Sequence, residues 1–192
     1  MLRDLYFYPL ALMVIAAVIG AALMSGEHET LSPQDILEQG YSAEGQGLSR
    51  LVASPGTNYE FVSEKGSQPA YVIMWTDIAR ANIGGSAGVF APLGPDYERA
   101  FGGQDLRMTI TARQSAANPL TEFDMGYFTA TVGDSAWQRR ALTPDWQDYS
   151  FTFSPNPPRG EADIDYFGIW PGEAGSGQRM DVSKMRIEVL SQ

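Results

Sequence analysis

Segment 106–113 alternates strictly between apolar and polar side chains. Leu106, Met108, Ile110 and Ala112 occupy every second position, with arginine or threonine between them. Because successive side chains of a β-strand point to opposite faces, this pattern predicts a strand with one buried and one solvated face. A chain that contains such a strand has to build a sheet that covers a core on one side.

Seven further segments have the composition of short strands and are bounded by clusters of Gly, Pro, Asn and Asp. Many short strands with turn residues between them predict an all-β domain, either a two-sheet sandwich or a barrel. The sequence holds no tandem repeat, so we expect residues 45–192 to form one domain. The seven segments are LSRLVA at 48–53, NYEFVS at 58–63, AYVIMWTDIA at 70–79, EFDMGYFTATV at 122–132, QDYSFTF at 147–153, DYFGIW at 165–170 and KMRIEVL at 184–190.

Residues 5–24 form an apolar run that contains no charged side chain. Twenty helical residues span about 30 Å, the thickness of the hydrocarbon core of a bilayer. The alternative is a cleaved signal peptide, whose apolar region is usually about 7–15 residues long and ends at a small-x-small site. The run in this chain is longer, and Gly20-Ala21-Ala22 is a mediocre cleavage site, so we predict a retained transmembrane helix.

Arg3 precedes the apolar run, and acidic residues follow it. The positive-inside rule therefore places residues 1–4 in the cytoplasm as a short stub, with the helix in a bacterial inner membrane and the body in the periplasm. Ala16 and Gly20 have small-xxx-small spacing, which predicts packing against another transmembrane helix.

Residues 25–44 are expected to form a linker that contains one short helix. Ser32 is a suitable N-cap, Pro33 can occupy the first helical position, and Asp35 lies in the first turn. Gly40 marks the end of this helix.

The composition excludes several classes of function. The chain has no cysteine, which excludes disulfides, thiolate metal sites and thiol nucleophiles. Its 23 acidic residues outnumber its 13 basic ones, for a formal net charge of −10, so we expect no nucleic-acid partner. The single histidine, His28, makes a Ser–His–Asp triad or a histidine metal site unexpected.

Three strand-like segments carry a family resemblance. TPDWQDYSFTFSP at 143–155 resembles the penultimate strand of carbohydrate-binding jelly rolls of the galactose-binding-like type, with Trp146 at a core-type position. RMDVSKMRIEVL at 179–190 resembles their closing strand, and LRMTITARQ at 106–114 resembles their central strand. The resemblance covers about residues 45–190 and implies a jelly-roll β-sandwich. In that family the counterpart of Asp181 usually ties down a loop.

Glu122 and Asp124 lie two residues apart and would project from one face of a strand. The segment TEFDMGYF at 121–128 resembles the acidic strand of laminarinase-type glycosidases, which are also jelly rolls. Retaining hydrolysis needs two carboxyl groups about 5–5.5 Å apart. The third acid of that motif would fall at Gly126 or Tyr127, so we predict a protein that is not an enzyme.

Aromatic side chains are candidate ligand contacts, because sugar rings stack on exposed aromatic faces and aromatic residues also anchor protein interfaces. Trp137 lies beside two arginines and Trp170 precedes a Pro-Gly turn, so we expect these two to be the most exposed. The candidate residues are Trp75, Tyr97, Trp137, Arg139, Tyr166 and Trp170.

Asp163 and Asp165 repeat the two-residue spacing of acids and predict a structural calcium site, since calcium takes carboxylate and backbone oxygens. Jelly rolls of the resembled type often hold such an ion. We expect no other cofactor.

These observations lead to two interpretations. The first is a membrane-anchored, noncatalytic extracytoplasmic binding module, with a glycan of the cell envelope as its ligand. The alternative is an accessory or structural subunit of a larger inner-membrane protein complex, docked through its transmembrane helix and its sandwich.

Overall fold

The chain divides into two units, Met1–Leu31 and Ser32–Gln192, and the second is described below. The predicted stub, the apolar run 5–24 and the Ala16–Gly20 pair lie outside the described residues. Within the described part, no helix is long and apolar enough to cross a bilayer. The computed structural model describes residues 31–78, 87–130, 133–172 and 177–190.

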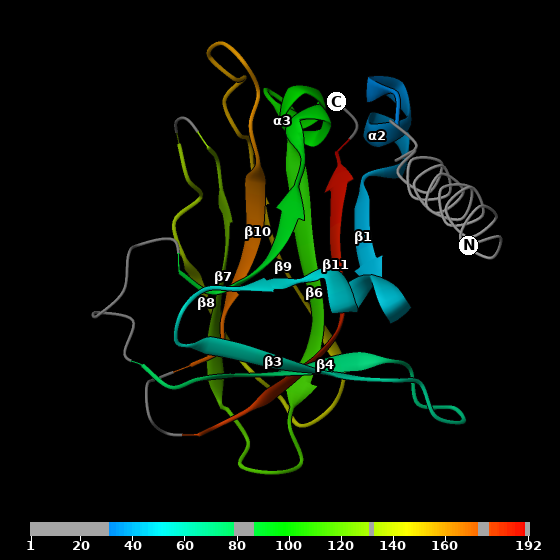
Figure 1. The fold of residues 1–192 in the computed structure, drawn as a ribbon, viewed down its shortest axis with the longest axis vertical. Helices are drawn as coiled ribbons and strands as arrows, with labels where there is room; N and C mark the ends of the chain where they lie inside the picture. The colour runs from blue at the N-terminus through cyan, green and yellow to red at the C-terminus, as the bar shows by residue number, and fades with distance from the viewer. Residues whose placement is uncertain (1–30, 79–86, 131–132, 173–176, 191–192) are drawn as a thin grey trace, which may run out of the picture. The chain divides into compact units, whose positions relative to one another are not determined.

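The body is a sandwich of two antiparallel β-sheets, as the sequence predicts, and most successive strands alternate between the sheets (Figure 1). In both sheets every named pair of strands is antiparallel. Sheet A contains, in spatial order, β3 (Thr57–Val62), β4 (Tyr71–Thr76), β11 (Met180–Val189), β6 (Leu106–Gln114) and β9 (Gln147–Phe153), and β1 (Tyr41–Glu44) also pairs with β11. Sheet B contains β2 (Val52–Ala53), β5 (Val89–Leu93), β10 (Asp165–Trp170), β7 (Glu122–Phe128) and β8 (Gln138–Ala141).

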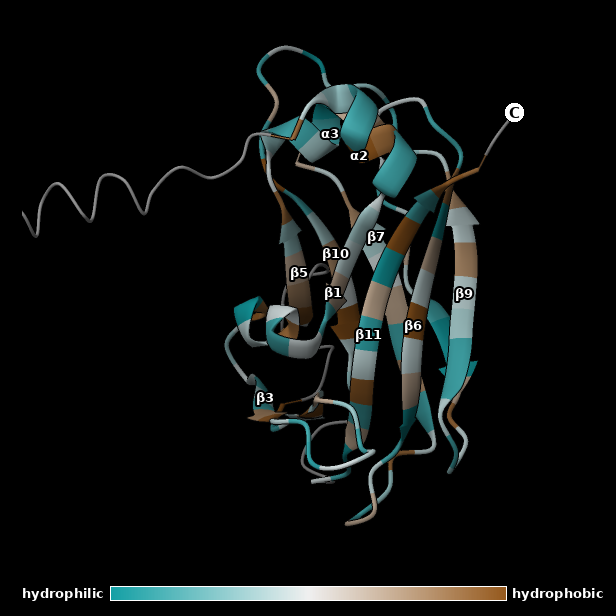
Figure 2. Ribbon diagram, turned by 90° about the vertical axis from the view of Figure 1, so that its right-hand side faces the viewer, coloured by the Kyte–Doolittle hydropathy of each residue, from teal (hydrophilic) through white to brown (hydrophobic). Residues whose placement is uncertain are grey.

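The core fills the space between the sheets and follows the two-residue alternation. All four apolar side chains of β6 that the sequence assigns to the core are fully buried. Figure 2 shows the alternation as bands of hydrophobic and hydrophilic residues along β6 and β11. Two ring contacts join the sheets, with centroids 5.2 Å apart for Phe123 and Tyr149 and 5.8 Å apart for Tyr127 and Phe153. Burial of each such side chain contributes about 1.5–3 kcal/mol.

The predicted short helix is present as α2 (Pro33–Gln39). The Ser32 hydroxyl accepts a hydrogen bond from the Asp35 amide, the Asp35 carboxylate accepts one from the Ser32 amide, and Gly40 follows with φ of 68°. This reciprocal cap satisfies two N–H groups that a helix start otherwise leaves unpaired.

Three other predictions about local structure differ from the structure. The segment LSRLVA does not form one strand: Gly45–Arg50 is a 3₁₀ helix, η1, and only Val52–Ala53 is extended. Residues Pro95–Phe101 form a helix, α3, that the sequence patterns do not predict. The second half of the expected linker contains Tyr41–Glu44, which pairs with β11 and is therefore part of sheet A.

Candidate binding site on the outer face of sheet B

Four of the six candidate residues lie on or beside the outer face of sheet B. Tyr166 and Trp170 are four residues apart on β10 and point to the same side. Trp170 is paired with Asp124 of β7, which is paired in turn with Arg139 of β8. Trp137 directly precedes β8. The register of three strands thus gathers residues that are distant in the sequence.

The centre of this face is made of two glycines. Gly126 and Gly168 are direct partners in the β7–β10 pair. A Cβ atom on Gly168 would lie 2.5 Å from the ring of Phe90, and one on Gly126 would lie 3.0 Å from the ring of Phe128. The absence of side chains at these two positions is what allows both phenylalanine rings to lie against the sheet.

Four aromatic side chains form a continuous row over Gly126 and Gly168, which we call the glycine floor. The ring centroids are 5.6 Å apart for Tyr166 and Phe90, 6.1 Å for Phe90 and Phe128, and 4.7 Å for Phe128 and Trp137. Phe90 and Phe128 are 7% and 4% exposed, whereas Tyr166 is 36% exposed. Tyr166 therefore exposes a much larger fraction of its surface to solvent than either phenylalanine does.

A hollow of about 310 Å³ lies beside the row, and we call it the aromatic pocket. Three of its lining residues are aromatic, and one, Asp134, carries a carboxylate. The Thr129 hydroxyl is buried and has no hydrogen-bond partner in the part of the chain that is described. The lining residues are Phe90, Phe128, Thr129, Ala130, Asp134 and Tyr166.

Hydrogen bonds to two aspartates hold Thr129 and Ala130, which form the wall of the aromatic pocket. The Asp165 carboxylate accepts from the Ala130 amide at 3.0 Å and from the Tyr127 hydroxyl at 2.6 Å. The Asp134 carboxylate accepts from the Thr129 amide at 3.1 Å. Burial raises the pKa of Asp165 above its ordinary value, against the two hydrogen bonds, which favour the charged form. Burial and the nearby Asp165 charge raise the pKa of Tyr127 as well.

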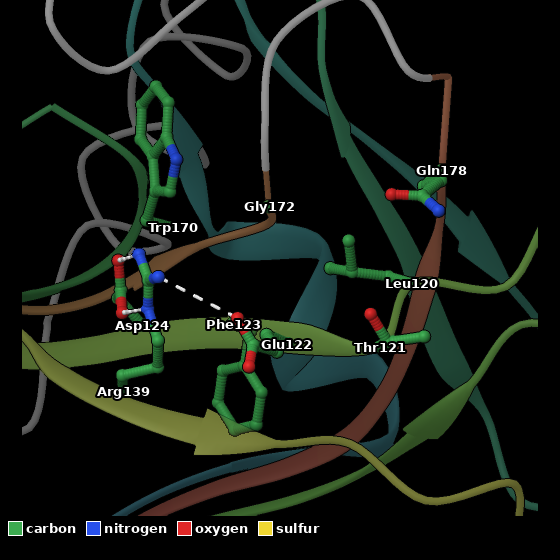
Figure 3. A pocket seen from close by; sticks show the side chains of 9 residues that line it. All are labelled: Leu120, Thr121, Glu122, Phe123, Asp124, Arg139, Trp170, Gly172 and Gln178. Atoms are coloured by element: carbon green, nitrogen blue, oxygen red, sulfur yellow. Dashed lines mark hydrogen bonds and ion pairs between the residues drawn. The ribbon is translucent and has the colours of Figure 1, made fainter.

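A second hollow on this face, of about 90 Å³, holds the acidic pair from the sequence analysis (Figure 3). The Arg139 guanidinium lies 3.0 Å from Asp124 and 3.6 Å from Glu122. Asp124 is buried, whereas the other two side chains are more than half exposed. The Trp170 ring points away from the Arg139–Asp124 pair, and Gly172 lies beside it.

This arrangement does not provide the two free carboxyl groups of a retaining glycosidase. Glu122 and Asp124 share a face of β7 as predicted, but Asp124 is buried and its carboxylate is engaged by Arg139. Gly126, next on that face, has no side chain. The strand therefore offers one exposed carboxylate, that of Glu122.

The remaining two candidates lie elsewhere. Trp75 is on the outer face of sheet A, where the Arg179 guanidinium stacks 4.6 Å from its ring centroid. Tyr97 is on α3 and packs edge-to-face on Tyr41, with centroids 5.6 Å apart. Neither residue reaches the aromatic pocket.

Two expectations about exposure are wrong. Trp170 is only 2% exposed, and Trp137 is half-buried against Phe128. Trp146, which the resemblance placed in the core, is instead half-buried on the outside of sheet A, with the Arg113 guanidinium 4.5 Å from its ring centroid.

Sequence reasoning missed Phe90, Phe128 and Asp134 as site residues. A signal for two of them was present, because a glycine inside a strand often marks a close approach by another group. Gly126 and Gly168 both carry that signal, and the rings of Phe90 and Phe128 are the groups that approach them.

The residues predicted for calcium do not fit a metal ion well. Both oxygens of Asp165 already accept hydrogen bonds, and one oxygen of Asp163 accepts from the Ile164 amide. The described residues contain no group of three or more acidic or histidine side chains that could hold a metal. The calcium site stays a prediction from the spacing of the two acids and from the resemblance.

No protein-family model matches the sequence, and no curated protein sequence is similar to it. Solved structures are similar. The C-terminal family 22 carbohydrate-binding module of Clostridium thermocellum Xyn10B is 14% identical with a TM-score of 0.55, covering 81% of this chain and 95% of that one. The CBM22-2 xylan-binding domain of Paenibacillus barcinonensis Xyn10C is 11% identical with a TM-score of 0.56, covering 78% and 99%.

The fold resembles that of carbohydrate-binding modules. This confirms the resemblance found in residues 45–190 at the level of the fold. At these identities the likeness does not carry over the ligand or the contact residues of either module.

Proposed function

We propose that this protein is a noncatalytic module that binds a glycan in the aromatic pocket on the outer face of sheet B. The observation that carries the proposal is the exposed Tyr166 ring, which lines a hollow together with the polar residues Thr129 and Asp134. Aromatic faces stack on the apolar side of sugar rings, and a few convergent polar groups fix the orientation of a ligand. The likeness of the fold to carbohydrate-binding modules supports this function.

The lining of the pocket favours a neutral, hydroxyl-rich sugar. Among the described residues that line it, Asp134 alone is charged, and its carboxylate accepts hydrogen bonds and repels acidic sugars.

The test is binding of the full chain in detergent to a panel of soluble neutral and acidic polysaccharides, measured by affinity electrophoresis and calorimetry. Tyr166→Ala should weaken binding about tenfold, because a stacked ring contributes about 1–1.5 kcal/mol. Trp75→Ala is the matched control, since Trp75 is a half-buried aromatic on the other sheet. Equal affinity of Tyr166→Ala and the unaltered chain, or binding to no polysaccharide, would reject the proposal.

We also propose that residues 5–24 anchor the module in a bacterial inner membrane, with residues 1–4 in the cytoplasm and the body in the periplasm. The uncharged run and the single Arg3 before it support this topology. Protease added to spheroplasts should degrade the body. Protection of the body until the membrane is lysed would contradict this topology.

The alternative function, an accessory subunit of an inner-membrane complex, is favoured by a different surface. On the outer face of sheet A, Arg113 stacks on Trp146 and lies 5.7 Å from the Tyr71 ring centroid. Tryptophan, tyrosine and arginine are enriched at the energetic centres of protein interfaces. Purification in mild detergent should then recover a larger assembly that Trp146→Ala disrupts and Tyr166→Ala does not. Recovery of the chain alone would argue against this role.

A further inference from the structure

One strand of sheet A carries large apolar side chains on its outer face. The outward residues of β4 are Tyr71, Ile73 and Trp75, and each is half-buried. The ring of Trp146, the residue before β9, lies edge-to-face on Tyr71 with centroids 6.0 Å apart. Because β11 and β6 lie between β4 and β9, this contact spans two strands. We give the name arginine–tryptophan patch to the surface formed by Tyr71, Ile73, Trp75, Arg113, Trp146 and Arg179.

The Arg113 guanidinium lies between two of these rings. It is 4.5 Å from the ring centroid of Trp146 and 5.7 Å from that of Tyr71. The buried carboxylate of Asp181, 2.9 Å away, balances its charge. Arg113 therefore holds the two rings together without adding net charge to the patch.

The second arginine of the patch, Arg179, is fixed in place just before β11. Its guanidinium lies 4.6 Å from the ring centroid of Trp75. Its backbone amide donates to the Asn118 carbonyl at 2.8 Å, and its carbonyl accepts from the Leu120 amide at 2.9 Å. A guanidinium that is stacked on a ring keeps its charge and offers its N–H groups at its edge. Arg179 is thus a preorganised donor on this surface.

Within the ranges that the structure describes, Arg179 pairs with no carboxylate. Asp77, two residues beyond Trp75, instead accepts a hydrogen bond from the Asn58 side chain at 2.7 Å. The charge of Arg179 is therefore complementary to a carboxylate that another molecule would bring.

The chemistry of the patch favours a protein partner over a glycan or a lipid surface. A sugar ring stacks on an aromatic face, and arginines already occupy faces of Trp75 and Trp146. Anionic lipids repel a chain with a formal net charge of −10. Tryptophan, tyrosine and arginine are the residue types that contribute most of the binding energy at protein interfaces.

We infer that the arginine–tryptophan patch docks a protein segment that carries a carboxylate beside apolar side chains. The inference rests on the subunit role proposed above and is independent of glycan binding. The apolar side chains of the segment cover Ile73 and the rings, and its carboxylate pairs with Arg179. Arginine donates two parallel hydrogen bonds to a carboxylate, so this pair fixes the orientation of the segment.

Photo-crosslinking in cells that produce the full chain tests the inference. An aliphatic side chain with a diazirine takes the place of Ile73, between Tyr71 and Trp75 on β4, or of Thr109, on the polar outward face of β6. We expect a protein adduct from position 73 and none from position 109, with aspartate or glutamate in the cross-linked segment. An adduct with lipid or glycan, or no adduct from position 73, would overturn the inference.

Arg179→Gln removes the charge that the partner should engage and leaves a polar side chain. We expect about a tenfold smaller adduct, a loss typical of an arginine that anchors an interface. Arg107→Gln, the same change at an exposed arginine of β6, is the matched control and should leave the adduct unchanged.

A second measurement needs no variant of Arg179. In membranes isolated from the same cells, added salt should weaken the adduct because it screens the ion pair. This measurement decides the role of Arg179 if Arg179→Gln does not fold. An adduct that neither Arg179→Gln nor salt reduces would contradict the proposed pairing.

The outcomes separate this inference from the two proposed functions. If no polysaccharide binds, glycan binding is rejected, and the adduct from position 73 still decides the role of the patch. Recovery of a larger assembly without that adduct would keep the subunit role and reject the patch as its contact. Recovery of the chain alone, without an adduct, would reject both.

Discussion

The outer faces of the two sheets are built on the same two-residue alternation but are used differently. On sheet A the outward side chains of β6, β9 and β11 are hydroxyls and charges that satisfy one another, as in the 2.8 Å Arg186–Glu188 pair and the 2.6 Å bond from Thr111 to Asp148. On sheet B the outward side chains include a row of rings. Rings on an outer face provide apolar surface for contact, whereas the self-paired polar strip of β6, β9 and β11 needs only water. The rings outside sheet A, those of Tyr71, Trp75 and Trp146, lie beyond this strip.

Truncation of one outward side chain on each sheet should have very different costs. Phe128→Ala removes a ring that is 4% exposed and touches both Phe90 and Trp137, so we expect a loss of about 3 kcal/mol in the free energy of unfolding. Thr109→Ala on sheet A should change it by less than about 0.5 kcal/mol. Denaturant titration measures both. Similar costs would mean that the two faces are equivalent.

Addition of a single methyl group to the glycine floor should have the next largest effect on the free energy of unfolding. Gly168→Ala places a Cβ atom 2.5 Å from the Phe90 ring, and we expect a loss of about 2 kcal/mol because the ring has to move. Gly47→Ala is the control, since a Cβ atom there meets nothing within 4 Å. If Gly168→Ala were as stable as its control, the ring would not depend on this glycine.

The smallest difference in the free energy of unfolding is expected between two arginine variants of sheet A. Arg113 pairs at 2.9 Å with the buried Asp181, so Arg113→Ala leaves a buried carboxylate without its partner, and we expect a loss of about 1–2 kcal/mol. Arg186→Ala breaks an exposed pair and should cost less than about 0.5 kcal/mol. Thermal unfolding of the two variants measures this difference. A cost for Arg186→Ala as large as that for Arg113→Ala would contradict the account.

Local patterns predicted much of the fold. The segments QDYSFTF and DYFGIW form strands with the predicted bounds, because their alternation and turn residues are readable over a few positions. Strand β5 was missed, since Val89–Leu93 is short, contains a proline and is buried on both faces, so it has no alternation.

The site was only partly predictable, because it depends on pairing between distant segments. Tyr166 and Arg139 could be selected from residue type alone. The burial of Phe128 on an outer face follows from Gly126 pairing with Gly168, a register that no local pattern contains. The aromatic row is therefore a property of the sheet and not of any one segment.

The most direct test of the account is hydrogen exchange across the full chain in detergent, with and without a polysaccharide that binds. Slower exchange should appear at Phe128–Ala130 and around Tyr166, with β6 and β9 unchanged. Protection on the outer face of β6 and β9, with none at the aromatic pocket, would show that the ligand binds the other sheet.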